Sequence, residues 1–172
     1  MRLPLPLETL PRRKSMMLGV MKTIATIPVG EYPHGLRPSP DGKWVYVANA
    51  KGTTLSVIDT ATNTKVADIE VGQKPVQVEF SPDGKFVYFS LNAENAVGKV
   101  DVATRAPVGK VNVGIGPIQV FVTPDSEYLL AANQGTKDNP STTVSIIDTT
   151  TFKVVGGVPG VRRACHYPSL ER

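Results

Sequence analysis

The sequence states nearly the same pattern three times at a fixed interval. "SPDGKWVYVAN" at residues 39–49 is followed 42 residues later by "SPDGKFVYFSL" and, after another 42, by "TPDSEYLLAAN". A Val-Gly pair at residues 29–30 recurs with the same spacing. The third unit is longer because five extra residues fall within "NQGTKDNPSTT". A period of about 40 residues indicates stacked units, each too small to bury its own apolar face.

Each unit reads as four short strands. In the first unit, a strand at about 34–38 ends at the turn "SPDG", where Pro sets φ and Gly accepts a positive φ. "KWVYVAN", "TLSVIDT" and "VADIEV" follow as three segments rich in β-branched residues. Helical periodicity is missing, and parallel solenoids usually have shorter periods. The sequence therefore predicts an all-β fold, a β-propeller of about three four-stranded blades.

Apolar positions of the first strand recur between units and predict the packing between blades. Leu36, Val78 and Val120 share one register, and Pro38, Phe80 and Val122 share another. We expect all six side chains to pack between neighbouring sheets. Trp44, Phe86 and Tyr128 share a third register, for which core packing is favoured over substrate stacking.

The first unit, "VGEYPHGLRPSPDGKWVYVANAKGTTLSVIDTATNTK", resembles the YVTN-type β-propeller repeat, with Tyr46-Val47-Ala48-Asn49 in place of the eponymous motif. The resemblance covers residues 23–160. It implies a periplasmic, cell-surface or extracellular location and a ring that as a rule has seven blades. It also implies a fold shared with WD40-like propellers, haem d1 domains of cytochrome-type nitrite reductases, and lactonases, but it gives no activity.

The expected domain organisation leaves the ring incomplete. Blades are predicted at about 31–71, 73–113 and 115–159, after a leader at 1–22 that we expect to be disordered. Residues 23–29 align with 65–71 and are predicted to be an orphan outer strand, whereas the tail 161–172 carries no repeat pattern. Two interpretations remain open. The chain is an N-terminal fragment of a longer propeller, or copies self-associate through exposed blade faces, each orphan strand finishing a blade of another copy.

Charge and composition exclude several classes of partner. The net charge of +4 is concentrated at the two ends, because residues 31–160 carry 11 basic and 13 acidic residues. We therefore expect no nucleic-acid partner. No apolar run approaches the length of a membrane span, and the basic segment near the start is followed by no recognisable signal peptide. A single cysteine, Cys165, makes neither an intrachain disulfide nor a cysteine-based zinc site.

Candidate ligand-binding residues lie in two sets of loops that open on one face of a propeller beside its channel. They are Glu31, Tyr32, His34, Asn49, Lys51, Lys74, Asn92, Asn133 and Lys137. His34 fills a register that holds Val76 and Ile118 in the other units. It could bind haem iron or another metal, carry a proton, pack at the channel mouth, or form a hydrogen bond with a neighbouring loop. Asn49 and Asn133 close the second strand, so a loop-capping role is the alternative to ligand contact.

Recurring aspartates have a structural explanation. They are Asp59, Asp101 and Asp148 at strand ends, and Asp41, Asp83 and Asp125 in the "PD" turns. Each could bind a cation, but the position before or within a turn favours acceptance of backbone N–H bonds.

Catalytic motifs are missing from the sequence. It contains no G-x-S-x-G elbow, no phosphate-binding glycine loop and no CxxCH haem attachment, so we expect no catalytic residues, no metal site and no cofactor. The sequence favours a non-catalytic binding or interaction scaffold of the cell envelope, with an unknown protein or small-molecule ligand. The alternative is a cofactor-binding or enzymatic propeller, either haem d1-like as in nitrite reductases or a lactonase-like hydrolase.

Overall fold

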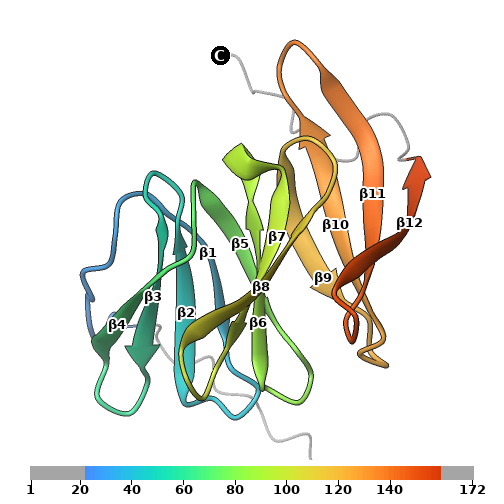
Figure 1. Cartoon of the computed structure of the whole chain (residues 1–172). Coiled ribbons are helices and arrows are strands. Elements are labelled where there is room, and N and C mark those ends of the chain that lie inside the picture. Colours follow the sequence, from blue (N-terminus) through green and yellow to red (C-terminus); the bar gives the residue numbers. More distant parts are fainter. Residues whose placement is uncertain (1–21, 160–172) are drawn as a thin grey trace, which may run out of the picture.

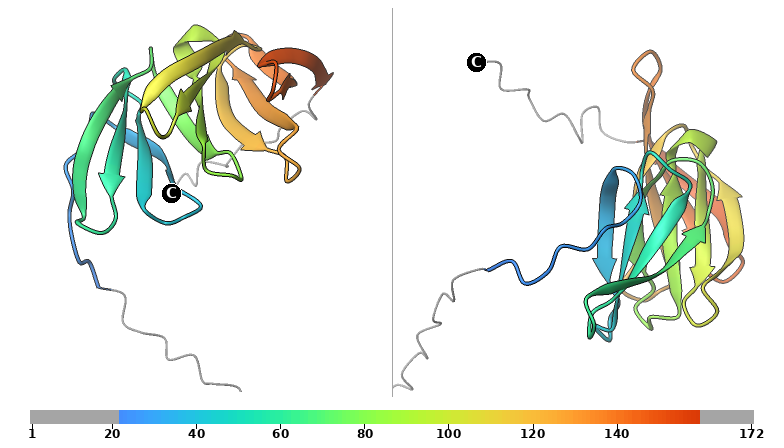
Figure 2. Two further views of the ribbon diagram at one scale, coloured as in Figure 1. Left: turned by 60° about the horizontal axis from the view of Figure 1, so that its bottom comes forward. Right: turned by 90° about the vertical axis from the view of Figure 1, so that its left-hand side faces the viewer.

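The computed structural model describes residues 22–159 and consists of three separate antiparallel sheets of four strands each. In every sheet the strands pair in chain order, so each sheet is a simple meander. Figures 1 and 2 show the three sheets standing side by side as an open arc. The predicted all-β fold of three four-stranded blades is therefore confirmed, and its ring is incomplete.

The blades follow one another along the chain. Blade 1 contains β1 (Pro33–Pro38), β2 (Trp44–Asn49), β3 (Thr54–Asp59) and β4 (Thr64–Glu70). Blade 2 contains β5 (Pro75–Phe80), β6 (Phe86–Leu91), β7 (Ala96–Asp101) and β8 (Ala106–Asn112), with the short 3₁₀ helix η1 (Asn92–Glu94) between β6 and β7. Blade 3 contains β9 (Pro117–Val122), β10 (Tyr128–Gly135), β11 (Pro140–Asp148) and β12 (Lys153–Pro159).

The "PD" turns close the first hairpin of each blade with the same hydrogen bonds. In blade 1, Ser39 Oγ donates to Asp41 Oδ1 at 2.6 Å, and the backbone N–H of Lys43 donates to the same oxygen at 3.1 Å. Asp83 and Asp125 accept the corresponding bonds in blades 2 and 3. The predicted structural role of these aspartates is confirmed.

The aspartates at the strand ends hold the turn between the third and fourth strands. The carboxylates of these aspartates accept hydrogen bonds from backbone N–H groups of the turn, with donors Ala61, Thr104 and Thr151 at 2.8, 2.8 and 2.7 Å. Asp59, Asp101 and Asp148 thus accept the turn's own backbone donors, as the sequence predicts.

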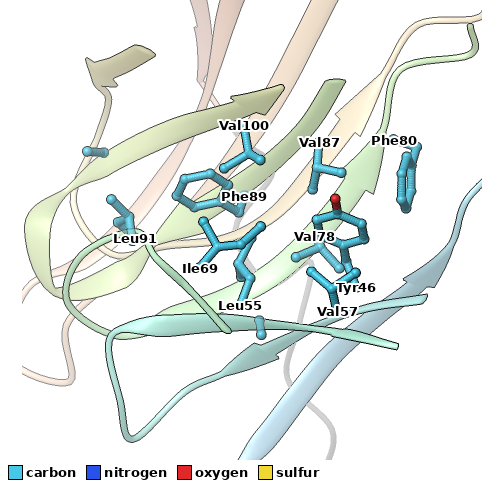
Figure 3. Packing of buried hydrophobic residues seen from close by; sticks show 12 residues of the cluster. Tyr46, Leu55, Val57, Ile69, Val78, Phe80, Val87, Phe89, Leu91 and Val100 are labelled. Carbon is cyan, nitrogen blue, oxygen red and sulfur yellow. The ribbon is translucent and has the colours of Figure 1, made fainter. Parts of the chain in front are cut away.

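The hydrophobic core lies between blades rather than within one. Tyr46, Leu55 and Val57 of blade 1 pack against Val78 and Phe89 of blade 2, as Figure 3 shows. A second cluster joins blades 2 and 3, and its fully or nearly buried members are Tyr88, Val97, Val120, Val122, Leu129, Ala131 and Ile147. Burial of one such apolar side chain stabilises the fold by about 1.5–3 kcal/mol. Each blade is therefore stabilised by its neighbour, which is why consecutive repeats fold together.

Leu36 and Pro38 depart from the predicted packing. Leu36 is 56% exposed and Pro38 is exposed, although Val78 and Val120 in the same register as Leu36 are 0% and 3% exposed. The shared register is correct, but the expectation that these two side chains pack between sheets is wrong. The physical reason is that no blade precedes blade 1 among residues 22–159.

The ends of the chain leave some predictions open. Residues 22–29 form no strand in this structure, and their pairing as an outer strand stays a prediction. The predicted leader, apart from Lys22, and the predicted tail 161–172 lie outside the described residues. In the part of the chain that the structure describes, no helix is long and apolar enough to cross a membrane.

Candidate functional site

In all three blades, both sets of loops in which the sequence places candidate ligand residues lie at the same end of the strands. The same backbone hydrogen bond ties the two sets together in every blade. The N–H of Ala50 donates to the Tyr32 carbonyl at 2.9 Å, that of Asn92 to Lys74 at 3.0 Å, and that of Gln134 to Gly116 at 3.0 Å. We call this end, formed by residues 29–32, 50–53, 71–74, 92–95, 113–116 and 136–139, the loop end.

Tyr32, Lys74 and Gly116 occupy equivalent positions at the loop end and share a left-handed backbone, with φ of 53°, 54° and 61°. Such a conformation costs an ordinary residue about 1–3 kcal/mol and glycine much less. In blade 3 a glycine is required, because a Cβ on Gly116 would lie 2.5 Å from the carbonyl oxygen of Gly135. Blades 1 and 2 instead hold a tyrosine and a lysine there, and both are exposed.

Tyr32 is the centre of an aromatic and cationic cluster. Its ring stacks on that of His34, with centroids 6.3 Å apart and planes inclined by 29°. The Nζ atom of Lys51 lies 5.3 Å from the Tyr32 ring centroid, within the range of a cation–π contact. Lys51 also donates its backbone N–H to the carbonyl of Glu31 at 3.2 Å. Glu31, Tyr32, His34 and Lys51, here called the Tyr32 cluster, are thus brought together, and all four are exposed.

His34 forms a hydrogen bond with the neighbouring blade. Its Nδ1 lies 3.2 Å from the carbonyl oxygen of Val76, one repeat further along the chain. In the tautomer that protonates Nδ1, this nitrogen donates and Nε2 is left as the acceptor. Val76 lies in strand β5 rather than in a loop, so this interaction joins His34 to a strand of blade 2, and its role in ligand binding stays a prediction. Among residues 22–159, no group of three or more His, Cys, Asp or Glu side chains is arranged to hold a metal ion.

Asn49 and Asn133 lie inside the molecule rather than on the loop surface. Their exposed fractions are 0% and 4%. Asn49 Nδ2 donates to Thr54 Oγ1 at 2.9 Å and to Ser56 Oγ at 3.0 Å, and Asn133 makes the same pair of bonds in blade 3. These bonds hold both side chains against the third strand of their blade, and the choice between loop capping and ligand contact stays a prediction.

Asn92 and Lys137 differ in their surroundings. Asn92 Nδ2 donates to the Pro117 carbonyl at 3.3 Å and so links blade 2 to blade 3. Lys137 is exposed at the tip of the hairpin between β10 and β11, which projects beyond the other loops in Figure 1. The five extra residues of the third repeat therefore extend the loop end.

Glu94 is the loop-end carboxylate with the most contacts. Lys110 Nζ lies 2.7 Å from its Oε2, and the backbone N–H of Gln73 donates to Oε1. The Lys110 hydrogen bond, followed by the one from Gln73, lowers the pKa of Glu94 below its usual value. The Glu94 carboxylate is ionised, but the charge of Lys110 balances it, so it repels an incoming anion less than an unpaired carboxylate would.

At the other end of the strands, opposite the loop end, an open depression of about 620 Å³ lies between blades 1 and 2. Trp44, Lys85 and the turn 101–105 line it, and the guanidinium carbon of Arg105 lies 4.7 Å from the Trp44 ring. Sequence reasoning missed this feature, because it depends on where the turn of blade 2 meets blade 1. Trp44 itself packs against the core cluster, as predicted for its register.

Phe86 and Tyr128, which share the register of Trp44, have different environments. Phe86 packs against the second cluster and lies under Lys99, whose Nζ is 3.9 Å from the ring centroid. Tyr128 is 38% exposed, so the predicted core packing is wrong for this residue. The cause is the same as for Leu36, since no fourth blade covers the far side of blade 3 in the described structure.

A sequence model of known proteins decides the family. The model described as YNCE-like beta-propeller matches residues 16–103, which include all of blade 1 and the first three strands of blade 2. The chain belongs to this family. Its four-stranded repeats, turn aspartates and blade-to-blade core are those of a β-propeller.

A solved structure is similar to this YNCE-like propeller over a larger share of the chain than the family model matches. Hydrazine synthase of Kuenenia stuttgartiensis superposes with a TM-score of 0.68 at 29% sequence identity over 73% of this chain. The alignment covers 36% of that chain, so the propeller described here spans about a third of its length. No curated protein sequence matches the chain significantly.

Proposed function

We propose that this YNCE-like propeller is a non-catalytic binding scaffold whose loop end receives an anionic group of a protein or small-molecule ligand. The observation that carries the proposal is the left-handed backbone conformation of Tyr32 and Lys74. At the equivalent position, blade 3 has a glycine, Gly116. Backbone strain of this kind suggests a use for the side chain, because glycine would form the same turn at lower cost.

The side chains at the loop end suit an anionic ligand. Lys51 and Lys74 are exposed cations, and Tyr32 is an aromatic residue that is 58% exposed. A tyrosine loses little conformational entropy on binding because it has only two side-chain torsions, and its hydroxyl donates a hydrogen bond. The rigid blades keep the loops in place, so the ordering cost of binding is small.

Glycine variants test this role without damage to the fold. Tyr32→Gly and Lys74→Gly reproduce the residue that blade 3 already has, and Lys51→Ala removes the cation over the ring. Lys43→Ala and Lys85→Ala are matched controls, since each removes an exposed lysine from the other end of the blades. Affinity purification from envelope extract should recover a partner with the wild-type chain and the controls but not with the loop-end variants. Identical partners for every variant would contradict the proposal.

The cell envelope is the proposed location, supported by the resemblance to YVTN-type repeats. Fractionation of cells that carry an epitope-tagged chromosomal copy tests it. Recovery of the tagged chain with a periplasmic marker enzyme would support this location, and recovery with a cytoplasmic marker would contradict it.

A cofactor-binding or enzymatic propeller is the second candidate, favoured by the exposed imidazole of His34 at the same end. Visible absorption of the purified chain, before and after incubation with haem, tests the haem version, with His34→Ala as the control. A band that the wild-type chain gains and this variant lacks would support cofactor binding. A lactonase assay on the same sample tests the hydrolase version.

A further inference from the structure

Among residues 22–159, blade 1 and blade 3 each have one sheet face that no other blade covers, and the two faces are of different kinds. We call the face of a blade toward the preceding repeat its trailing face, and the face toward the following repeat its leading face. The trailing face of blade 1 exposes Leu36, of which 56% is accessible. The leading face of blade 3 exposes Tyr128 and Val158, of which 38% and 51% are accessible.

The leading face of blade 3 repeats a face that is buried in blade 2. Phe86 and Val111 of blade 2 stand at the positions of Tyr128 and Val158, and both pack against the cluster shared with blade 3. Tyr88, at the position of Leu130, is 2% exposed. Within this chain, therefore, the trailing face of a following blade covers a face of this kind.

The trailing face of blade 1 likewise repeats faces that are buried in blades 2 and 3. Leu36 corresponds to Val78 and Val120, which are 0% and 3% exposed. Pro38, which is exposed, corresponds to Phe80 and Val122, which are 6% and 7% exposed. The two uncovered faces are thus the two halves of an interface that the chain already forms twice.

A polar contact between blades 2 and 3 also has counterparts on the two faces, although the interface between blades 1 and 2 lacks it because Ala50 stands at the position of Asn92. Asn92 Nδ2 of blade 2 donates to the carbonyl of Pro117 in blade 3 at 3.3 Å. Gln134 stands at the position of Asn92 one repeat later, and it is exposed. Pro33 stands at the position of Pro117 in blade 1. A carboxamide donor and a backbone acceptor are therefore present on the two uncovered faces, as they are inside the arc.

We propose that the leading face of blade 3 binds the trailing face of blade 1 in a second copy of this chain, as consecutive blades bind within one copy. Two copies joined twice in this way close the blades of residues 22–159, three from each copy, into one ring, a size within the range of about four to eight blades seen in propellers. The fourth-strand position of blade 3 is filled by β12, so residues 23–29 of the other copy can add to it only as a further strand. The association therefore rests on sheet faces and needs no exchanged strand.

Sedimentation equilibrium of the full chain tests the proposal. At a concentration of about 100 μM, the wild-type chain should have about twice the 18.5 kDa mass of one copy. Leu36→Asp and Val158→Asp each place a charge on one of the two faces, and each alone should give a monomer. Both positions are exposed, so the fold of one copy should survive, which circular dichroism verifies. Val108→Asp is the matched control, because this valine is 52% exposed on β8 and should leave the mass unchanged.

Mixing the two variants distinguishes this interface from one between identical faces. The Leu36→Asp chain keeps an intact blade 3, and the Val158→Asp chain keeps an intact blade 1. Their mixture should therefore form a pair that neither variant forms alone. A wild-type chain that stays monomeric, a single variant that associates as the wild type does, or a mixture that remains monomeric would each overturn the proposal.

Discussion

Arg37 Nε donates to Glu79 Oε2 at 3.0 Å, although 42 residues separate the two side chains. Both occupy the same position of the first strand in consecutive repeats. Since both side chains are partly exposed, the pair adds little to stability and its value is geometric. It shows that equivalent strands of neighbouring blades lie next to each other, which is the relationship expected around the axis of a propeller.

The contact between Gly98 and Phe89 gives the first prediction. A Cβ atom at Gly98 on β7 would overlap the ring of Phe89, which is buried in the core between blades 1 and 2. Gly98→Ala should lower the free energy of unfolding by about 1–3 kcal/mol, because the ring has to leave its packed position. Urea denaturation followed by circular dichroism measures this change.

Gly156→Ala is the matched control for this prediction. Gly156 lies on β12, and the nearest atom to a Cβ there would be Ile146 Cδ1 at an ordinary 3.8 Å. This variant should be neutral or slightly stabilising, because alanine restricts the unfolded chain more than glycine does. Equal losses of stability from the two variants would show that the ring of Phe89 is not packed as described.

Gly114 and Asn133 give the second prediction. A Cβ atom on Gly114 would lie 2.5 Å from Asn133 Nδ2, so Gly114→Ala forces the Asn133 carboxamide away from Thr143 and Ser145. Asn133→Ala removes those bonds and also makes room for the methyl group. Each single variant should cost about 1–3 kcal/mol, and the double variant should cost clearly less than the two losses together. Strict additivity in the double-mutant cycle would contradict the contact.

The turn aspartates give the third prediction, on pH. A hydrogen bond from Ser81 and one from the Lys85 backbone lower the pKa of Asp83 below its usual 3.8, and equivalent bonds lower those of Asp41 and Asp125. Because the folded-state pKa lies below the unfolded one, the stabilisation is fully present above about pH 4 and is lost as the pH falls through the folded values. The urea midpoint should therefore fall as the pH is lowered below about 4.

Replacement of the same carboxylates checks this origin of the pH dependence. A variant with Asp41→Ala, Asp83→Ala and Asp125→Ala should be less stable than the wild type at neutral pH. Its urea midpoint should change less than that of the wild type as the pH is lowered below about 4. A wild-type midpoint that stays constant on acidification, or an equal decline in the variant, would contradict the prediction.

The repeat makes most of the fold predictable from the sequence. The burial of individual side chains is not predictable in the same way, because it depends on whether another blade covers them. The turns at Asp41 and Asp59 depend on a few adjacent residues, so their hydrogen bonds follow from local sequence. The exposure of Leu36 depends on whether another sheet covers it, and a register alone does not carry that information. For this reason a single alignment of the repeats predicted the same burial for Leu36 and Val78, and only one of them is buried.

The candidate site shows the same division. The loops that carry Tyr32 and Lys74 could be located from the repeat, because loop position follows from strand order. The left-handed backbone of these two residues was not predicted, although the alignment with Gly116 was a usable signal. The burial of Asn49 also needs the structure, because it depends on Thr54 and Ser56 pointing to the same side of the sheet.

Distances between the three outer-strand valines test the central claim, that equivalent blades follow one another around an arc. Val66, Val108 and Val155 occupy equivalent positions on β4, β8 and β12, and they are 42%, 52% and 58% exposed. Spin labels can be attached in pairs to cysteines at these sites in a Cys165→Ser chain, diluted with unlabelled chain, and measured by pulsed electron paramagnetic resonance. The account predicts nearly equal distances for 66–108 and 108–155, and a 66–155 distance longer than either but shorter than their sum. A 66–155 distance equal to that sum, as in a straight stack of sheets, or unequal steps between neighbouring blades, would contradict it.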